Sequence, residues 1–255
     1  MAVLRAEWTK QRTVAGPAWL LAGTVVATSA IGVAVAGAAR CPAAGCGQDP
    51  GKISLAGVYL GQAVVAILGV LVIGNEYSTG MIRVTLTAIP HRLTMLAAKA
   101  SVLSAPVLTA AALATAGSML AGRLMLPGRG FTPTHGYPTL TGSADLRAAA
   151  GTMLYLTLVA LLGLGIATAV RDSAVSIGVV LALLYLFPVV AGLISDRPLQ
   201  RHLEQIAPMN AGLDIQATIG VRGLPLSPWQ GLGVVALWTT GALLLGALAL
   251  RLRDA

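Results

Sequence analysis

The side chains that could perform chemistry are few in this sequence and lie far apart. Its three histidines, His91, His135 and His202, are too dispersed to indicate a metal site or a catalytic triad. The nearest approach to a phosphate-binding loop, CGQDPGKI, has Cys46 where the first glycine belongs and Ile53 where a hydroxyl would bind magnesium. No serine has the context of a nucleophile elbow. We therefore expect no catalytic residue, cofactor or metal in this chain and do not expect an enzyme.

The two cysteines leave a choice open. Cys41 and Cys46 lie in the segment CPAAGC, where proline and glycine favour a turn. A small-loop disulfide is expected if this segment faces an oxidising exterior, and two free thiols are the alternative. A metal site needs more ligands than one such pair offers.

A polar stretch, GNEYSTGMIRVTLTAIPHR at residues 74–92, interrupts two long apolar runs. Apolar residues recur at helical spacing from it into the following run, while polar residues occupy another face. The apolar set is Ile82, Leu86, Ile89, Leu93 and Leu96, and the polar set is Arg83, Thr87 and Thr94. This pattern predicts a surface-lying helix, preceded by a turn at Gly80 and broken near Pro90. A plain interfacial linker is the alternative.

The elements that must position this stretch are membrane spans. The chain of 255 residues is 56% hydrophobic and 10% charged, with a mean hydropathy of +0.81, whereas soluble domains are about 25% charged. Six windows, 126 residues in total, are long enough to cross about 30 Å of hydrocarbon. They are residues 17–37, 55–74, 100–121, 149–170, 174–194 and 231–250. We expect an all-α, polytopic membrane protein that forms a single transmembrane domain over 1–255.

Charge distribution supports this interpretation and limits the function. All 26 charged side chains fall outside the six windows. Since proton- and ion-coupled carriers keep ionisable residues inside the membrane, such coupling is disfavoured. The net charge of +8 is spread over the loops, which favours lipid headgroups over nucleic acid as its partner.

Loop charge also gives an orientation. Six spans place both termini on one side, and that side holds 9 Lys and Arg in 49 loop residues, against 8 in 80 opposite. The positive-inside rule then predicts cytoplasmic termini, with residues 75–99 as a cytoplasmic loop. The first span begins after 16 residues and should be retained. Residues 1–16 fit an interfacial helix or a charged cap on that span, and residues 195–230 should hold a short outer helix around Leu199–Ile206.

Small residues and prolines mark places where the spans should depart from plain helix packing. Gly57 and Gly61 have the GxxxG spacing that lets two helices approach closely, within one chain or between two. Pro106 and Pro188 lie inside the third and fifth windows, where each removes a backbone hydrogen bond and predicts a kink.

The polar stretch resembles the loop after the second span in type-2 ABC exporter permeases, the six-span membrane subunits of bacterial ATP-binding cassette exporters. The similar residues are Glu-Tyr, Thr-Gly, a hydrophobic-Arg step, then Leu, Pro and Arg. The AEWTK start, the short turn Arg171-Asp172-Ser173 and the long outer region before the sixth span are also similar. The order Ser78-Thr79-Gly80 departs from the Gly-then-Thr order of many relatives.

The resemblance implies a coupling helix between spans two and three that docks on a cytoplasmic ATPase subunit. The residues it assigns to this coupling region are Glu76, Tyr77, Gly80, Arg83, Pro90 and Arg92. Glu76 and Arg83 would make polar contacts at the ATPase, Gly80 and Pro90 would shape the helix, and Arg92 would anchor it at the headgroups. ATP and Mg²⁺ would be bound by the partner.

The function expected from this resemblance is export across the bacterial cell membrane by a dimer of permease subunits, identical or similar. Apolar spans suit a hydrophobic or amphipathic cargo, such as a drug, a peptide antibiotic or a lipid. Two alternatives remain: a non-transporting membrane scaffold or sensor subunit, and a secondary carrier that works without nucleotide.

Overall fold

A computed structural model describes residues 9, 15–41, 47–88, 91–132 and 142–252 of the chain. This part is all-α, and six of its helices are long and apolar enough to cross a membrane, which confirms the six expected spans. They are α2 (Ala15–Ala38), α4 (Val58–Ser78), α6 (Arg92–Met125), α7 (Ser143–Val170), a composite fifth span and α12 (Pro228–Leu252). The fifth span joins α8 (Ser173–Leu181), a π-helical turn η3 (Ala182–Leu186) and α9 (Phe187–Gly192).

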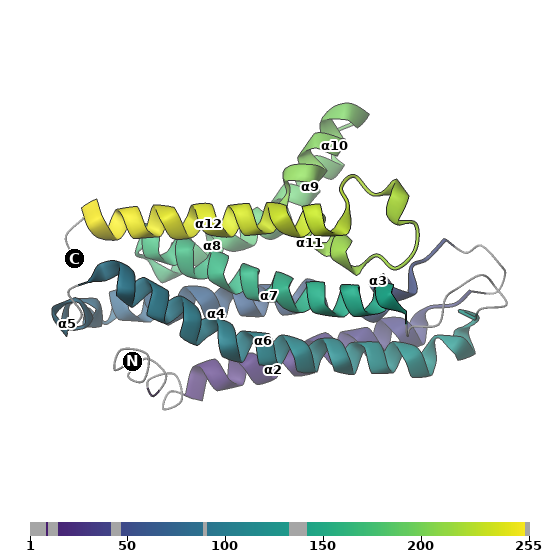
Figure 1. Ribbon diagram of the computed structural model, residues 1–255, viewed down its shortest axis with the longest axis horizontal. Coiled ribbons are helices and arrows are strands. Elements are labelled where there is room, and N and C mark those ends of the chain that lie inside the picture. Colours follow the sequence, from purple (N-terminus) through teal and green to yellow (C-terminus); the bar gives the residue numbers. More distant parts are fainter. Residues whose placement is uncertain (1–8, 10–14, 42–46, 89–90, 133–141, 253–255) are drawn as a thin grey trace.

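Five spans and α8 of the fifth span lie roughly parallel to one long axis (Figure 1). The helix α5 (Met81–Ala88) lies at one end, which is also where α2 begins and α12 ends. Described residues near both termini therefore share one side, as six spans require. Loops holding α3 (Pro50–Ser54) and η5 (Val221–Gly223) lie at the opposite end. The expected interfacial helix of residues 1–16 falls almost wholly outside the described residues.

The helices extend past the apolar windows that predicted them. α6 begins at Arg92 rather than at residue 100, and α4 ends at Ser78 rather than at residue 74. Hydropathy alone stops a window at a charged residue, but the backbone stays helical wherever that charge finds a partner. The spans therefore include charged side chains that the windows excluded.

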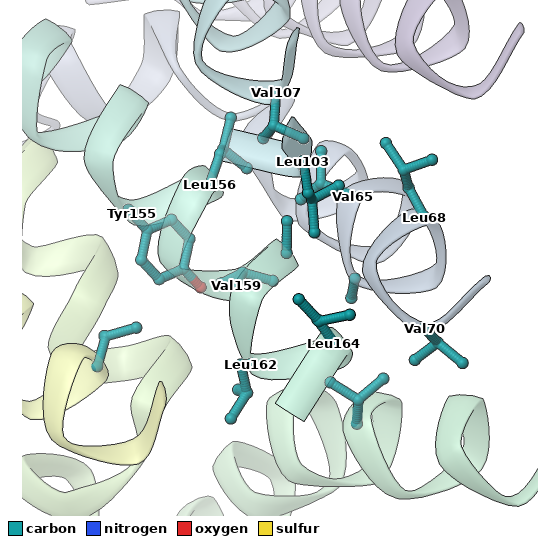
Figure 2. Close-up of a cluster of buried hydrophobic side chains, with 14 of the residues drawn as sticks. Val65, Leu68, Val70, Leu103, Val107, Tyr155, Leu156, Val159, Leu162 and Leu164 are labelled. Atoms are coloured by element: carbon teal, nitrogen blue, oxygen red, sulfur yellow. The ribbon is translucent and has the colours of Figure 1, made fainter. Parts of the chain in front are cut away.

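The core lies between α4, α6 and α7. Figure 2 shows Val65 and Val70 of α4 together with Val107 of α6 and Leu156 and Val159 of α7. Aliphatic side chains from three helices pack closely together there. This core fixes how the spans are spaced along the whole bundle.

Glycines bring α4 against α7. A Cβ added to Gly69 would lie 1.9 Å from the carbonyl oxygen of Ala160, and one added to Gly163 would lie 2.4 Å from that of Ala66. Each helix thus presents a glycine to the backbone of the other. This reciprocal contact is the small-residue packing typical of membrane helices.

The GxxxG pair is used within the chain. A Cβ on Gly57 would lie 1.9 Å from the carbonyl oxygen of Thr28, and one on Gly61 would lie 2.3 Å from the Thr28 hydroxyl. Both glycines therefore face α2. The spacing predicted a close approach, and its partner is the neighbouring span of the same molecule.

The two prolines have different effects. α6 continues as one helix through Pro106, whereas the fifth span changes to a π-helical turn just before Pro188. Pro188 has no N–H for the carbonyl four residues earlier, and a π-turn is a common way to absorb that loss. Beyond it, α9 and α10 (Arg197–Ile206) project away from the bundle (Figure 1). α10 confirms the short helix predicted around Leu199–Ile206, and its position on the outer side of the membrane stays a prediction.

Glycine replacements test the α4–α7 contact. Gly69→Ala should lower stability by about 1–3 kcal/mol, because the added methyl must push the helices apart. Gly178→Ala on α8 is the matched control, since a Cβ there meets nothing within 4 Å and alanine should add up to about 1 kcal/mol of helix propensity. The measurement is the unfolding midpoint in detergent. Equal midpoints for the two variants would contradict the close packing.

Candidate functional site

The polar stretch between the second and third spans forms α5, entered through a left-handed turn at Gly80. Gly80 has a φ of +71°, a backbone conformation that glycine adopts without steric cost. Just before it, the hydroxyl of Thr79 donates to the carbonyl of Asn75 at 2.7 Å and helps to end α4. Arg83 and Thr87 are exposed on α5. The helix and its turn are therefore as the sequence predicts.

The apolar face of α5 only partly matches the expected one. Ile82 and Leu96 are buried, but Leu93 is 40% exposed. Ile89 and Pro90 lie outside the described residues, so the expected break at Pro90 stays a prediction. Leu93 is exposed because α6 has already begun at Arg92, which places residue 93 on a different helix from Ile82.

A buried ion pair joins α4 to α6 directly behind α5. Lys99 Nζ donates to Glu76 Oε1 at 2.7 Å, and both side chains are 1% exposed. Glu76 lies in the last turn of α4 and Lys99 in the third turn of α6. Removing two charges from water costs several kcal/mol per ion, and only a close, well-aligned partner offsets this. The pair therefore holds the ends of two spans in one fixed arrangement.

This pair changes the expected role of Glu76. The sequence assigns it to a polar contact with a partner protein, but here its side chain points into the bundle and binds Lys99. Its carboxylate is not presented on the surface of this structure. Glu76 thus links the end of α4 to α6, and its expected contact with a partner stays a prediction.

Two arginines bind the C-terminal end of α12. Arg171 donates to the carbonyl of Ala249 at 2.9 Å, and Arg92 donates to the carbonyl of Leu250. The last four carbonyls of a helix have no partner within it, and the C-terminal end of the helix dipole favours cations. Arg92 thereby ties the start of α6 to α12, although the sequence assigned it to lipid headgroups.

Arg171 also contacts Tyr77. Its guanidinium lies 5.7 Å from the centre of the Tyr77 ring, within the range of a cation–π interaction. Arg171 ends α7 in the left-handed conformation, with a φ of 66°, and Asp172 then caps α8 by accepting from the Val175 N–H at 2.8 Å. This sharp turn places one guanidinium between α4, α7 and α12. We call Glu76, Lys99, Tyr77, Arg171 and Arg92 the α5-end network.

A cavity of about 370 Å³ lies beside the network. It is lined by Tyr77, Gly80, Ile82, Arg83 and Arg171. With two guanidinium groups in its wall, this recess favours an anionic group such as a carboxylate. It opens at the base of α5, so a ligand there would contact both the helix and the network.

The opposite end of the bundle is held by a carboxylate that binds backbone. Asp49 caps α3 through the Gly51 N–H at 2.9 Å and also accepts from the backbone N–H groups of Thr218 and Ile219, at 2.7 and 3.1 Å. The loop between the first two spans is thus fastened to the loop before the sixth span. Nothing in the spacing of residues 169 positions apart signals this contact.

A nearby surface pair joins the same two loops. Lys52 Nζ lies 3.2 Å from Asp214 Oδ1. Burial raises the pKa of Asp214, and the attraction of Lys52 opposes that rise. Asp214 belongs to a segment that includes α11 (Pro208–Leu213) and η4 (Asp214–Gln216), and most of this segment is buried against α7 and α12. The loop before the sixth span is therefore partly inserted into the bundle.

The two cysteines are only partly within the described residues. Cys41 is buried and disulfide-bonded, while Cys46, the only other cysteine of the chain, lies outside the described residues, so their pairing stays a prediction. Within the described ranges, no three His, Cys, Asp or Glu side chains lie close enough to hold a metal ion.

Sequence reasoning missed Lys99 and the role of Arg171. The sequence does contain a signal for Lys99. Glu76 lies just after the second apolar window and Lys99 just before the third, so the two opposite charges lie at the neighbouring ends of consecutive spans. Such residues meet when two antiparallel spans pack together. Arg171 had been noted only as part of a short turn.

Neither a protein-family model nor a curated protein sequence matches this chain.

A double-mutant cycle tests the buried pair. Lys99→Met or Glu76→Gln alone should cost about 3–5 kcal/mol, because each leaves the partner without its counter-charge in a dry site. The double variant should be clearly more stable than the sum of the two losses implies. Chemical unfolding in detergent gives the four free energies.

The matched control is the other ion pair. Lys52→Met breaks a pair whose lysine is 43% exposed, and exposed pairs contribute only about 0–1 kcal/mol. Additive losses at Glu76 and Lys99, or a loss no larger than that of Lys52→Met, would refute the positioning role.

Proposed function

We propose that this chain is the membrane subunit of an ATP-driven exporter of the type-2 ABC permease kind. The observation that supports this most is the attachment of α5 at the end of the bundle. A surface helix on a flexible loop could not transmit force to the spans. Here the helix is preceded by α4 and followed by α6, whose ends are locked by the Glu76–Lys99 pair.

In this proposal a cytoplasmic ATPase subunit docks on α5 and moves it. The α5-end network passes that movement to the spans, since Glu76 and Lys99 link α4 with α6, and Arg92 and Arg171 link both to α12. Close glycine contacts between α4 and α7 continue the path, because backbones in contact move together. ATP and Mg²⁺ bind the ATPase subunit, and this chain supplies the lever and the pathway.

The docking chemistry follows from the recess at the base of α5. Arg83 is exposed and lines the cavity together with Arg171. A partner that presents an aspartate or glutamate there would form charge-assisted hydrogen bonds. In this proposal Arg83 makes the direct polar contact with the ATPase subunit, whereas the family resemblance assigned that contact to both Arg83 and Glu76.

The proposed pathway forms between two permease subunits in the bacterial cell membrane, with both termini in the cytoplasm. The cargo is a hydrophobic or amphipathic compound, because many exposed side chains of the spans, which could face a second subunit, are large and aliphatic. A scaffold or sensor subunit would assemble with the ATPase but would not raise its turnover when cargo is added. A secondary carrier would transport in liposomes without the ATPase.

A charge reversal tests the docking surface. Arg83→Glu should weaken copurification with the ATPase subunit at least about tenfold, since a buried charge contact across an interface contributes about 2–5 kcal/mol. ATP-dependent transport should fall in parallel. Arg222→Glu is the matched control, because Arg222 is also exposed but lies in η5 at the opposite end.

Three outcomes separate the candidates. Loss of the complex only in Arg83→Glu supports docking at α5. An intact complex with full transport in that variant would remove α5 as the docking site. Gradient-driven transport by the chain alone would replace the proposal with a secondary carrier.

Cysteine labelling tests the orientation. In a Cys41→Ala/Cys46→Ala background, Thr87→Cys should resist a membrane-impermeant maleimide in intact cells, and Ser227→Cys should react with it. Both positions are exposed and lie at opposite ends of the bundle. Labelling after cell lysis controls for reactivity. Reaction of Thr87→Cys in intact cells would place α5 outside and overturn coupling to a cytoplasmic ATPase.

A further inference from the structure

A second, larger cavity lies on the side of the bundle and shares no lining residue with the cavity at the base of α5. Its volume is about 750 Å³, within the range of about 300–1,000 Å³ typical of small-molecule sites. Its walls are α7, α8 and α12, and Gln205 and Ile206 of α10 close one end. We call it the side groove.

The side groove has no polar group left to satisfy. Only Gln205 and Trp238 among its lining residues have polar side-chain atoms. The Trp238 indole N–H donates to the carbonyl of Ile206 at 2.9 Å, and the Gln205 amide donates to the carbonyl of Pro225 at 3.1 Å. A ligand with donors or acceptors would leave its own groups unpaired there, which is costly. The lining therefore selects a plain hydrocarbon chain.

The groove opens toward the surroundings of the spans. Leu237 and Leu245 on its rim are 74% and 64% exposed. Since α7, α8 and α12 belong to candidate membrane spans, these side chains face lipid hydrocarbon. Bilayer lipid is thus the molecule with direct access.

Its dimensions fit one acyl chain. The lining on α12 runs from Val234 to Leu245, which at 1.5 Å per residue is about 16 Å. The chains of one leaflet span about 15 Å, half of the hydrocarbon thickness.

We propose that the side groove binds one acyl chain of a membrane phospholipid as a resident ligand. The chain lies along α12 between α7 and α8, and the headgroup lies toward α10. α10 contacts the groove through Gln205 and Ile206 at its C-terminal end, and exposed Arg201 lies one helical turn before Gln205. This site does not depend on the proposed transport function.

Two glycines of α12 provide a matched test. A Cβ at Gly241, which lines the groove, and a Cβ at Gly233, which does not, both meet nothing within 4 Å. Gly241→Phe should therefore fill the groove and Gly233→Phe should not. Each protein is reconstituted in vesicles of palmitoyl-oleoyl phosphatidylethanolamine and phosphatidylglycerol, extracted in mild detergent and examined by native mass spectrometry.

The wild type and Gly233→Phe should retain one phospholipid. Retention by Gly241→Phe should fall about tenfold, because displacing a few methylene groups is enough for a change of that size. Equal retention by both variants, or a lipid-free wild type, would overturn the proposal. A lipid-free dimer of the wild type that Gly241→Phe converts to monomer would assign the groove to a second copy instead.

Fluorescence gives a test that needs no groove-filling variant. Two proteins keep a single tryptophan, Trp238 in the groove or Trp229 near the start of α12, with the other tryptophans replaced by phenylalanine. After reconstitution in phosphatidylcholine with brominated acyl chains and detergent extraction, Trp238 should stay quenched while Trp229 recovers. Full recovery of both would exclude a resident lipid.

Discussion

The buried contact between Glu76 and Lys99 is the constraint on which the α5 end of this protein depends. Two full charges lie 2.7 Å apart, almost without access to solvent. Such a pair tolerates little change in geometry, because any separation leaves both ions desolvated without compensation. The ends of α4 and α6 are therefore fixed relative to each other. Because α5 connects these two helices, its position is also fixed, and so is the position of the cavity at its base.

The two ends of the bundle are held by different kinds of interaction. At the α5 end, charged side chains bind one another and the carbonyls of α12. At the other end, one carboxylate, Asp49, binds the backbone of a distant loop. Between them, glycines let α4 and α7 touch along their backbones. The fifth span differs, since its π-turn and Pro188 interrupt the regular ladder. Deformation of the bundle should thus concentrate in that span.

Much of the fold could be predicted from apolar runs and a few turn residues. The six spans, the helix after Gly80 and the outer helix near Leu199 were all predicted because each depends on local pattern. Which helices and side chains of the chain contact one another was not predicted. Hydropathy windows ended at Glu76 and Lys99 and so treated them as loop residues, and the GxxxG spacing did not say which helix faces Gly57. Contacts such as Asp49 with Thr218 depend on the folded path of the chain, which local sequence does not contain.

The arginine contacts with the end of α12 have a consequence for how the protein is made. Of the six spans described here, α12 is the last in chain order, so it is also synthesised after the other five. Arg92 and Arg171 can bind the carbonyls of Leu250 and Ala249 only once α12 has been made. The base of α5 therefore stays incomplete while the first five spans are assembling. A variant truncated before Ala249 would lack both bonds.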